Sequence, residues 1–306
     1  NIRLVGEKSH SRIFKLFAVA WHLGRSQPRI VHLDGFDSCY LACALKAVRL
    51  LRSYLIFTVR SDRYNHFKWW DKLLLSYVDE LVTNSEYSRG QILKSLGRDA
   101  LVHYSPIDLE RILEEVRATE SCVDSHGKVV VAYVGSIEPR KRVDFFIRVA
   151  NIIASRSDRF VFHIYGQAKD KSGSELLSSS LKAGGAKALD RIIIKGYTPI
   201  SVAIAETDIL VCPFIDEPLG RVVPEFLYAG RRVIVADSGG LEEAGCGFAE
   251  VFTHNDEEAC AEIIMRDVRA QRLEIMRNAL RERFSPMSCG RLDYMLYNKA
   301  LRISNE

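Results

Sequence analysis

Short apolar runs alternate with longer amphipathic or charged segments along almost the whole chain. The runs are rich in Val, Ile, Leu and Phe, and they lie at 31–35, 55–59, 80–85, 101–104, 129–135, 160–166, 192–197, 209–214, 233–236 and 249–253. Most of them are typical of strands buried on both faces, as in a parallel sheet. Segments such as 13–23, 39–51, 69–78 and 291–301 predict helices. The alternation predicts a doubly wound α/β protein.

A polar stretch, Ser121-Cys-Val-Asp-Ser-His-Gly-Lys128, separates two series of these elements. A chain of 306 residues is long enough for two domains of ordinary size. We therefore predict a Rossmann-like N-terminal domain over 1–122, a second over 123–285 and a final helix over 286–306.

Composition excludes several classes of protein. With 47% hydrophobic and 27% charged residues, the chain is expected to be folded and soluble rather than disordered. No apolar run approaches the ~20 residues that span a bilayer. No signal peptide is recognisable, although the chain begins at Asn1 without a methionine, which predicts a missing preceding segment. Seven scattered cysteines without a CxxC pair predict a reducing, cytoplasmic setting and no zinc site.

Positive charge is concentrated in the first part of the chain. Residues 1–72 hold thirteen Lys and Arg against five Asp and Glu, a net of +8, whereas the whole chain carries +4. This indicates either an anionic partner, such as phosphate groups or the inner face of the cell membrane, or simply a solvated basic surface. Residues 63–70 mix cations with four aromatics, which suits peripheral membrane contact or a lipid-linked acceptor. The alternative is a helix that buries Trp69 and Trp70. No nucleic-acid-binding motif accompanies these residues.

The most informative stretch is Glu217-Pro-Leu-Gly-Arg-Val-Val-Pro-Glu225. It lies between the predicted strands 209–214 and 233–236, so one carboxylate is at a turn and the other in a helix. Gly220 allows the backbone to approach a ligand and to offer N–H groups to an anion. A carboxylate beside an anion site suits hydroxyl groups. The stretch therefore predicts a ligand that carries both phosphate and sugar.

This Glu-x7-Glu motif, followed by Asp237-Ser-Gly-Gly-Leu-Glu-Glu243, resembles the donor-binding half of GT-B glycosyltransferases, especially the retaining family 4. The resemblance implies a GT-B fold: two doubly wound Rossmann-like domains facing across a cleft, with a final helix that crosses back to the first domain. Relatives open with a strand and a glycine-rich loop, and nothing before Ile30 matches them. The N-terminal, acceptor-side domain is therefore expected to be short and truncated, either because the given sequence lacks this element or because the protein has lost it.

A second segment, Gly135-Ser-Ile-Glu-Pro-Arg-Lys-Arg142, resembles the phosphate-binding segment of the family. Lys141 stands at the family's lysine position, but Ser136 stands where relatives have an arginine. Arg140 and Arg142 are the candidates to supply the missing charge, because arginine suits bidentate phosphate contact. Three cations before a helix oppose the macrodipole, which favours a functional role over a structural one.

The resemblance assigns roles to further residues. It implies that Glu217 contacts the donor sugar, that Glu225 contacts the ribose, and that the amides of Leu219, Gly220, Arg221 and Val222 meet the diphosphate. Gly166 ends a strand at the family's glycine turn, and Tyr197 is expected either to stack on the base or simply to pack. Gly239, Gly240 and Glu243 match the turn that closes the pocket. On the acceptor side, Asp34 and Arg60 end neighbouring strands, with Arg60 where relatives often carry a histidine.

The implied activity is retaining transfer of a hexose from a UDP- or GDP-linked sugar to a glycan or lipid-linked acceptor. Glu217, Lys141 and Arg140 are the predicted catalytic residues. The family generally needs neither a metal nor another cofactor, and none is expected here. The alternative is a degenerate, non-catalytic GT-B module that binds a nucleotide sugar or a partner glycosyltransferase.

Overall fold

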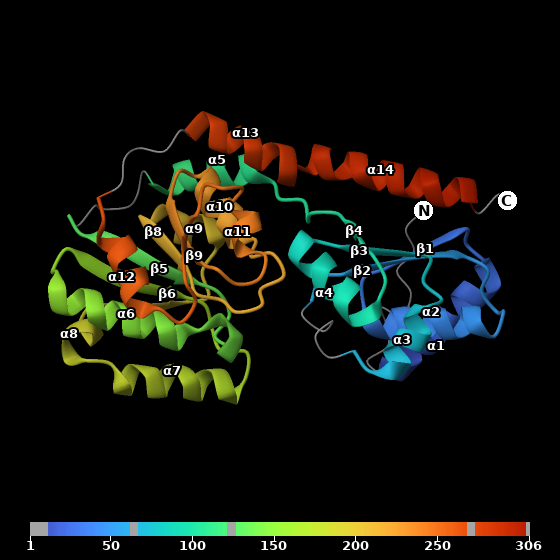
Figure 1. Ribbon diagram of the computed structural model, residues 1–306, viewed down its shortest axis with the longest axis horizontal. Helices are drawn as coiled ribbons and strands as arrows, with labels where there is room; N and C mark the ends of the chain where they lie inside the picture. Colours follow the sequence, from blue (N-terminus) through green and yellow to red (C-terminus); the bar gives the residue numbers. More distant parts are fainter. Residues whose placement is uncertain (1–11, 62–66, 121–126, 268–272, 304–306) are drawn as a thin grey trace. The chain divides into compact units, whose positions relative to one another are not determined.

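The computed structural model describes residues 12–61, 67–120, 127–267 and 273–303, and the chain divides into two compact units (Figure 1). The first unit contains residues 1–105 and 289–306, and the second contains residues 106–288. The predicted boundary at residue 122 differs from this division, because helix α5 (Leu109–Glu120) belongs to the second unit. Leu109, Leu113 and Val116 of α5 are buried, and the helix packs against α9 and α10 of that unit.

The first unit is built on a four-stranded parallel sheet with the strand order β1-β2-β3-β4. The strands are β1 (Ile30–Leu33), β2 (Tyr54–Val59), β3 (Glu80–Thr83) and β4 (Leu101–Val102). The helices are α1 (Arg12–Ser26), α2 (Phe36–Ala47), α3 (Trp69–Leu75), α4 (Glu86–Leu96) and the main part of α14 (Pro286–Ile303).

Alternating side chains of β2 separate the two faces of this sheet. Leu55 and Phe57 are fully buried in a core that α1 to α4 complete, whereas Ile56 packs against Leu296 and Ala300 of α14. The final helix therefore covers the face opposite to α2. Polar contacts fix it there: Lys299 Nζ lies 2.5 Å from Glu80 Oε2.

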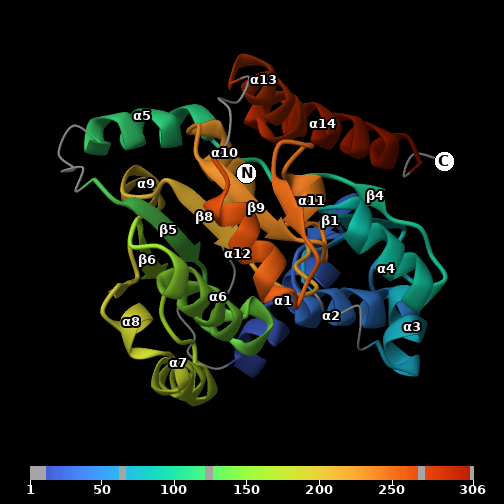
Figure 2. The same cartoon turned by 60° about the vertical axis from the view of Figure 1, so that its left-hand side comes forward.

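The second unit holds a six-stranded parallel sheet with the order β10-β9-β8-β5-β6-β7. Figure 2 shows the central strands β9, β8, β5 and β6 side by side in this order. The strands are β5 (Val129–Val134), β6 (Phe160–Tyr165), β7 (Ile192–Gly196), β8 (Ile209–Cys212), β9 (Arg232–Ala236) and β10 (Glu250–Phe252). The helices are α5, α6 (Val143–Arg156), α7 (Lys171–Ala183), α8 (Ala186–Leu189), α9 (Ile200–Ala205), α10 (Val222–Tyr228), α11 (Leu241–Ala244), α12 (Glu257–Met265) and α13 (Leu273–Phe284), with a 3-10 turn at Pro139–Lys141. Helices α6, α7, α8 and α12 form one layer, and α5, α9, α10 and α13 form the other.

The strand order of the second sheet reverses between β5 and β8, which are hydrogen-bonded neighbours although 74 residues lie between them. In doubly wound sheets, ligands bind outside the carboxyl ends of the strands at such a reversal. The carboxyl ends of β5 and β8 lead directly into Gly135 and into the segment that contains Glu217. The predicted strands are confirmed, α14 begins at the predicted residue 286, and the topology brings the two predicted motifs to one edge.

Candidate functional site

Glu217 is the centre of a cluster of charges at the carboxyl edge of the second sheet. Lys141 Nζ and Arg140 NH1 each donate a hydrogen bond of 2.7 Å to the same carboxylate oxygen, Oε2. Lys141 and Arg140 belong to the 3-10 turn after β5, and Glu217 belongs to the loop between β8 and α10. The three residues predicted to be catalytic therefore lie in direct contact.

The environment of Glu217 keeps its carboxylate ionised. Burial alone would raise its pKa, but the positive charges and hydrogen bonds of Lys141 and Arg140 outweigh burial and hold the pKa below its usual value. Lys141 Nζ also lies 3.9 Å from the centre of the Phe214 ring. The lysine is thus fixed by a carboxylate and by an aromatic face, and Phe214 is a site residue that the sequence analysis missed.

Two glycines of the Asp237–Glu243 segment hold the backbone of Glu217 in place. Gly239 has a φ of +68°, and a Cβ atom there would lie 2.3 Å from the Glu217 carbonyl oxygen. A Cβ atom on Gly240 would lie 2.4 Å from the Pro218 carbonyl oxygen, and the Gly240 N–H donates to the Glu217 carbonyl at 2.8 Å. Only glycine fits at these positions without backbone movement. These two glycines therefore position the carboxylate loop.

Glu225 lies in α10 in a different environment from Glu217. Its side chain is buried, with a residue exposure of 8%, and burial raises its pKa to about 7. Arg221 opposes this shift but stands 3.9 Å away, and its side chain is largely exposed. Two carboxylates of one motif thus have separated pKa values, one lowered and one raised. Such a separation is common at functional sites.

The backbone between these carboxylates turns sharply at Gly220, which has a φ of +80°. Leu219 is buried, and α10 begins at Val222 directly after Gly220 and Arg221. Amide groups at the start of a helix have no acceptor within the helix itself. The amides of Leu219, Gly220, Arg221 and Val222 therefore remain the predicted diphosphate contacts.

Ser136 is connected to the charge cluster through Glu138, which the sequence analysis did not single out. Ser136 Oγ donates to Glu138 Oε1 at 2.9 Å, and Arg140 NH2 lies 3.2 Å from the same oxygen. Lys169 Nζ donates to Glu138 Oε2 at 3.2 Å. Glu138 thus orients Arg140 towards Glu217. The sequence contained a signal for this role, because Glu138 is an acidic residue two positions before the cationic run Arg140-Lys141-Arg142.

Arg142 does not join the cluster at Glu217. Its guanidinium donates to Asn255 Oδ1 at 2.5 Å and lies 3.4 Å from Asp144 Oδ2. Its backbone is left-handed, with a φ of +54°, where it caps α6. Of the two arginines considered as substitutes for the missing charge, Arg140 alone contacts Glu217 in the described part of the chain.

A hollow of about 310 Å³ lies at the carboxyl ends of β5, β6 and β7. Its lining includes Gly135, Ser136, Gly166 and Tyr197. Gly166 has a φ of +144°, and a Cβ atom there would lie 1.9 Å from the Gly135 carbonyl oxygen. The Tyr197 side chain is 80% exposed at the mouth, so the alternative that it packs in the core is wrong. Four of the predicted binding residues therefore surround one cavity.

In the first unit, the structure brings Asp34 and Arg60 together at the carboxyl ends of β1 and β2. Arg60 NH1 lies 3.5 Å from Asp34 Oδ2, and both side chains are exposed. The stretch 63–70 lies partly outside the described residues, but its two tryptophans are described. Trp69 is 71% exposed and Trp70 is 43% exposed. The alternative in which a helix buries both tryptophans is therefore wrong.

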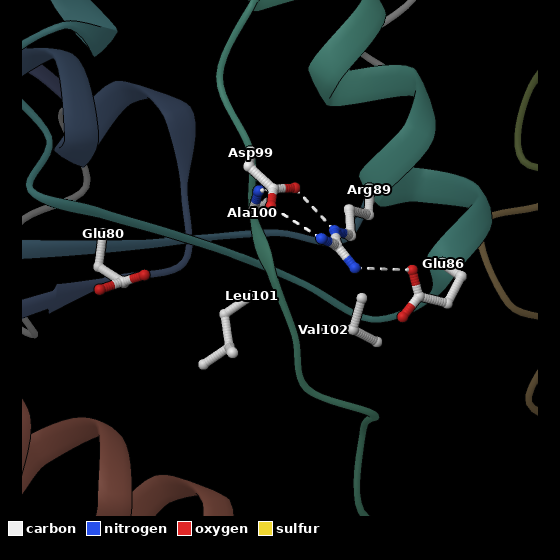
Figure 3. A pocket seen from close by; sticks show the side chains of 7 residues that line it. All are labelled: Glu80, Glu86, Arg89, Asp99, Ala100, Leu101 and Val102. Carbon is white, nitrogen blue, oxygen red and sulfur yellow. Dashed lines mark hydrogen bonds and ion pairs between the residues drawn. The ribbon is translucent and has the colours of Figure 1, made fainter.

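A hollow of about 330 Å³ beside α4 and β4 contains Glu86 at the start of α4 (Figure 3). Arg89 donates to both oxygens of Asp99 at 2.7 and 2.8 Å, and to Glu86 Oε2 at 3.2 Å. Arg89, Asp99 and Glu86 thus form one connected group of hydrogen bonds and ion pairs in this view. Glu80 instead pairs with Lys299, which the figure does not label. This hollow therefore has the character of a surface ion-pair network.

Within residues 12–61, 67–120, 127–267 and 273–303, no group of three or more His, Cys, Asp or Glu side chains has an arrangement that could hold a metal ion. Among the helices in those same ranges, none is both long and apolar enough to cross a membrane.

Comparison with known proteins finds a family match within the second unit. Residues 128–268 match the sequence model of the family described as glycosyl transferases group 1. A search of curated proteins found no match.

Solved structures with this fold include HepE of Anabaena in complex with UDP and glucose, which is 16% identical with a TM-score of 0.77, over 95% of this chain and 84% of that one. Sucrose-phosphate synthase of Thermosynechococcus elongatus is 16% identical with a TM-score of 0.75, over 94% and 77% of the two chains. A glycosyltransferase of Rickettsia africae is 16% identical with a TM-score of 0.73, over 98% and 84%. At this identity the likeness shows the fold, which is GT-B.

Proposed function

We propose that this chain, a GT-B protein whose residues 128–268 form a glycosyl transferases group 1 domain, is a retaining glycosyltransferase. It transfers a hexose from a nucleotide-diphospho-sugar, UDP- or GDP-linked, to a glycan or lipid-linked acceptor. The observation that carries the proposal is the convergence of Lys141 and Arg140 on Glu217 at 2.7 Å. Complexes of HepE with UDP and with UDP-glucose make a nucleotide sugar the first ligand to test.

The proposed donor-site residues fall into two groups: cations that contact the diphosphate and carboxylates that contact sugar hydroxyl groups. Lys141 and Arg140 are proposed to neutralise the charge that grows on the departing diphosphate, together with the amides at the start of α10, and their shared contact with Glu217 supports this role. Glu217 is an ionised acceptor for sugar hydroxyls, and Glu225 for the ribose. Tyr197 provides an exposed ring for stacking on the base.

In the proposed reaction, the bond between the anomeric carbon and the diphosphate oxygen breaks. The acceptor oxygen then bonds to that carbon on the same face, and the leaving phosphate takes the acceptor's proton. This scheme needs no side-chain nucleophile and no bound metal, since two side chains and backbone amides supply the positive charge. Asp34 and Arg60 are the proposed acceptor-side residues.

Peripheral contact with the inner face of the membrane is part of the proposal. Trp69 and Trp70 are exposed on α3, and Lys68 Nζ lies 4.8 Å from the centre of the Trp70 ring. Exposed aromatics with adjacent cations are typical of proteins that rest on a membrane surface. A lipid-linked acceptor would then be reached from that surface.

The proposal is tested by donor hydrolysis and by thermal unfolding with UDP, GDP, ADP and their sugar conjugates. One nucleotide is expected to stabilise the protein, by ~2.7 kcal/mol at ~100 times its Kd. The matching sugar nucleotide is expected to be hydrolysed slowly without acceptor, and Glu217→Ala and Lys141→Ala should abolish hydrolysis. Binding without hydrolysis or transfer would favour the degenerate module, which the serine at position 136 and the arginine at position 60 support. An absence of binding would reject the donor site.

A further inference from the structure

Glu206 directly follows α9 and connects the two strands beside the hollow of about 310 Å³, although it is not among the residues that line it. Tyr165 OH donates to Glu206 Oε2 at 2.7 Å, and Lys195 Nζ lies 2.9 Å from the same oxygen. Tyr165 ends β6, and Lys195 belongs to β7. We propose that Glu206 is a positioning residue for the nucleotide base, because it places Tyr197 at the mouth of the hollow. The inference rests on the proposed donor site.

The register between β6 and β7 shifts by one residue at Lys195. Ile164 pairs with Ile194. The next residue of β6, Tyr165, pairs with Gly196 and skips Lys195. Lys195 is therefore the extra residue of a β-bulge, a feature that often lies beside active sites and redirects a side chain there. Gly196, directly after the bulge, has a φ of +70°, which favours glycine.

This shift determines which residue after β7 lies beside Gly166 at the hollow. Continuing the shifted register places Tyr197 opposite Gly166, and the Gly166 N–H accordingly donates to the Gly196 carbonyl at 2.7 Å. Without the extra residue, Gly196 would be opposite Gly166, and the side chains after this point would change faces of the sheet. Tyr197 lines the hollow and is 80% exposed. The bulge therefore brings this aromatic ring to the hollow.

The surroundings of Glu206 keep its carboxylate ionised. Burial alone would raise the pKa of Glu206, but hydrogen bonds from Lys195 and Tyr165 and the charge of Lys195 hold the pKa below its usual value. His163 Nδ1 lies 3.0 Å from Tyr165 OH. Because the hydroxyl proton of Tyr165 points to Glu206, His163 Nδ1 is the donor in this contact. Burial lowers the pKa of His163, which is therefore neutral at pH 7.

Glu206 acts on the hollow through its two partners. Tyr165 and Tyr197 line the hollow, whereas Glu206 and Lys195 do not. The side chains of Lys195 and Glu206 are only 31% and 25% exposed, so solvent and salt screen this pair less than a surface pair. Within the described ranges, Lys195 forms no other ion pair. Loss of the Glu206 carboxylate should therefore release the bulge and, with it, the position of Tyr197.

Isothermal titration of the full chain with UDP, GDP and ADP identifies the nucleotide that binds most tightly, which is then the probe. Tyr197→Ala should weaken its binding about tenfold, because the stacking ring is removed. Glu206→Ala should cause a similar loss. Glu206→Gln keeps an oxygen that can accept the same hydrogen bonds and should stay within about threefold of wild type. As a matched control, Glu258→Ala breaks the ion pair with Arg156 and should change the Kd less than about twofold.

The double variant Glu206→Ala/Tyr197→Ala tests whether Glu206 acts through Tyr197. If it does, the double variant binds no more weakly than Tyr197→Ala alone, because the ring that Glu206 positions is already absent. Lys195→Met releases the bulge from the other side and takes the place of Glu206→Ala in this comparison if that variant does not fold.

Losses that add in the double variant, or a wild-type Kd in Glu206→Ala, overturn the inference and leave the donor site standing. Binding of no nucleotide by the wild-type protein rejects the donor site itself and the inference with it. Because only binding is measured, each result is independent of whether the protein transfers sugar.

Discussion

Lys141 and Glu217 are 76 positions apart in the sequence, yet Lys141 Nζ lies 2.7 Å from Glu217 Oε2. Removing Lys141 leaves Arg140 to compensate the charge of Glu217 in a largely buried place. We expect Lys141→Met to lower the unfolding free energy by about 1–3 kcal/mol and donor turnover by about 100-fold or more. Chemical denaturation and donor hydrolysis measure the two effects.

The double variant Lys141→Met/Glu217→Gln separates structure from chemistry. Because both charges are removed together, part of the lost stability should return, whereas turnover should stay as low as in the single variant. Lys171→Ala removes a lysine from an exposed pair with Glu175 and should change neither quantity. A recovery of turnover in the double variant would show that Lys141 serves stability alone.

Arg140 and Arg142 should differ sharply, although only one residue separates them. Arg140 contacts Glu217 and Glu138, whereas Arg142 contacts Asn255 and Asp144. We expect Arg140→Ala to weaken nucleoside diphosphate binding by about tenfold or more. Arg142→Gly should bind within about twofold of wild type, because glycine accepts the left-handed backbone at position 142. Titration calorimetry provides both numbers.

A gain-of-function control restores positive charge at Ser136 in the variant that lacks Arg140. Ser136→Arg in the Arg140→Ala background returns a guanidinium to the segment that follows β5. Nucleotide affinity should recover at least in part if charge near the diphosphate is what Arg140 supplies. If Arg142→Gly loses as much affinity as Arg140→Ala, the assignment of Arg140 fails.

The donor motif could be predicted from local patterns. The apolar strand 209–214, the turn with Gly220 and the Gly239-Gly240 pair are all encoded in short segments, and the structure places them in one loop system around Glu217. The sequence could not predict that the Arg140 side chain points to Glu217 and the Arg142 side chain points away from it. The position of the Arg142 side chain depends on its contact with Asn255, 113 positions away, and on the left-handed backbone of Arg142. The structure divides the chain at residue 106 rather than at the predicted residue 122 for a similar reason: α5 packs on α9 and α10, which are distant in sequence.

Gly239 should be far less tolerant of a side chain than Gly247. Both have positive φ values, +68° and +80°, but a Cβ atom at Gly247 meets nothing within 4 Å, whereas one at Gly239 would lie 2.3 Å from the Glu217 carbonyl oxygen. Gly247→Ala is expected to cost about 1 kcal/mol from backbone strain alone. Gly239→Ala should cost more and should also weaken nucleotide binding, because the carboxylate loop must move. Equal losses of stability, with binding intact in both variants, would contradict this account.

Glu225 should make both stability and nucleotide binding depend on pH. Burial raises its pKa to about 7, from an ordinary value near 4.5. The folded state therefore favours the protonated carboxyl, whose contribution is complete below pH ~4.5 and is lost as the pH rises through ~7. Above that range, ionised Glu225 should cost on the order of 3 kcal/mol. Glu225→Gln should thus be more stable than wild type at pH 8, by an amount that shrinks towards pH 5.

Nucleotide binding should show the opposite dependence, because an ionised Glu225 is the better acceptor for ribose hydroxyls. The Kd of the nucleotide should therefore fall about tenfold between pH 6 and pH 8 in the wild type, and it should be flat in Glu225→Gln. Glu175→Gln, a change on the exposed face of α7, should retain the wild-type profile. Titration calorimetry of all three proteins across this range checks the prediction, and a profile that survives in Glu225→Gln would assign the pH dependence to another group.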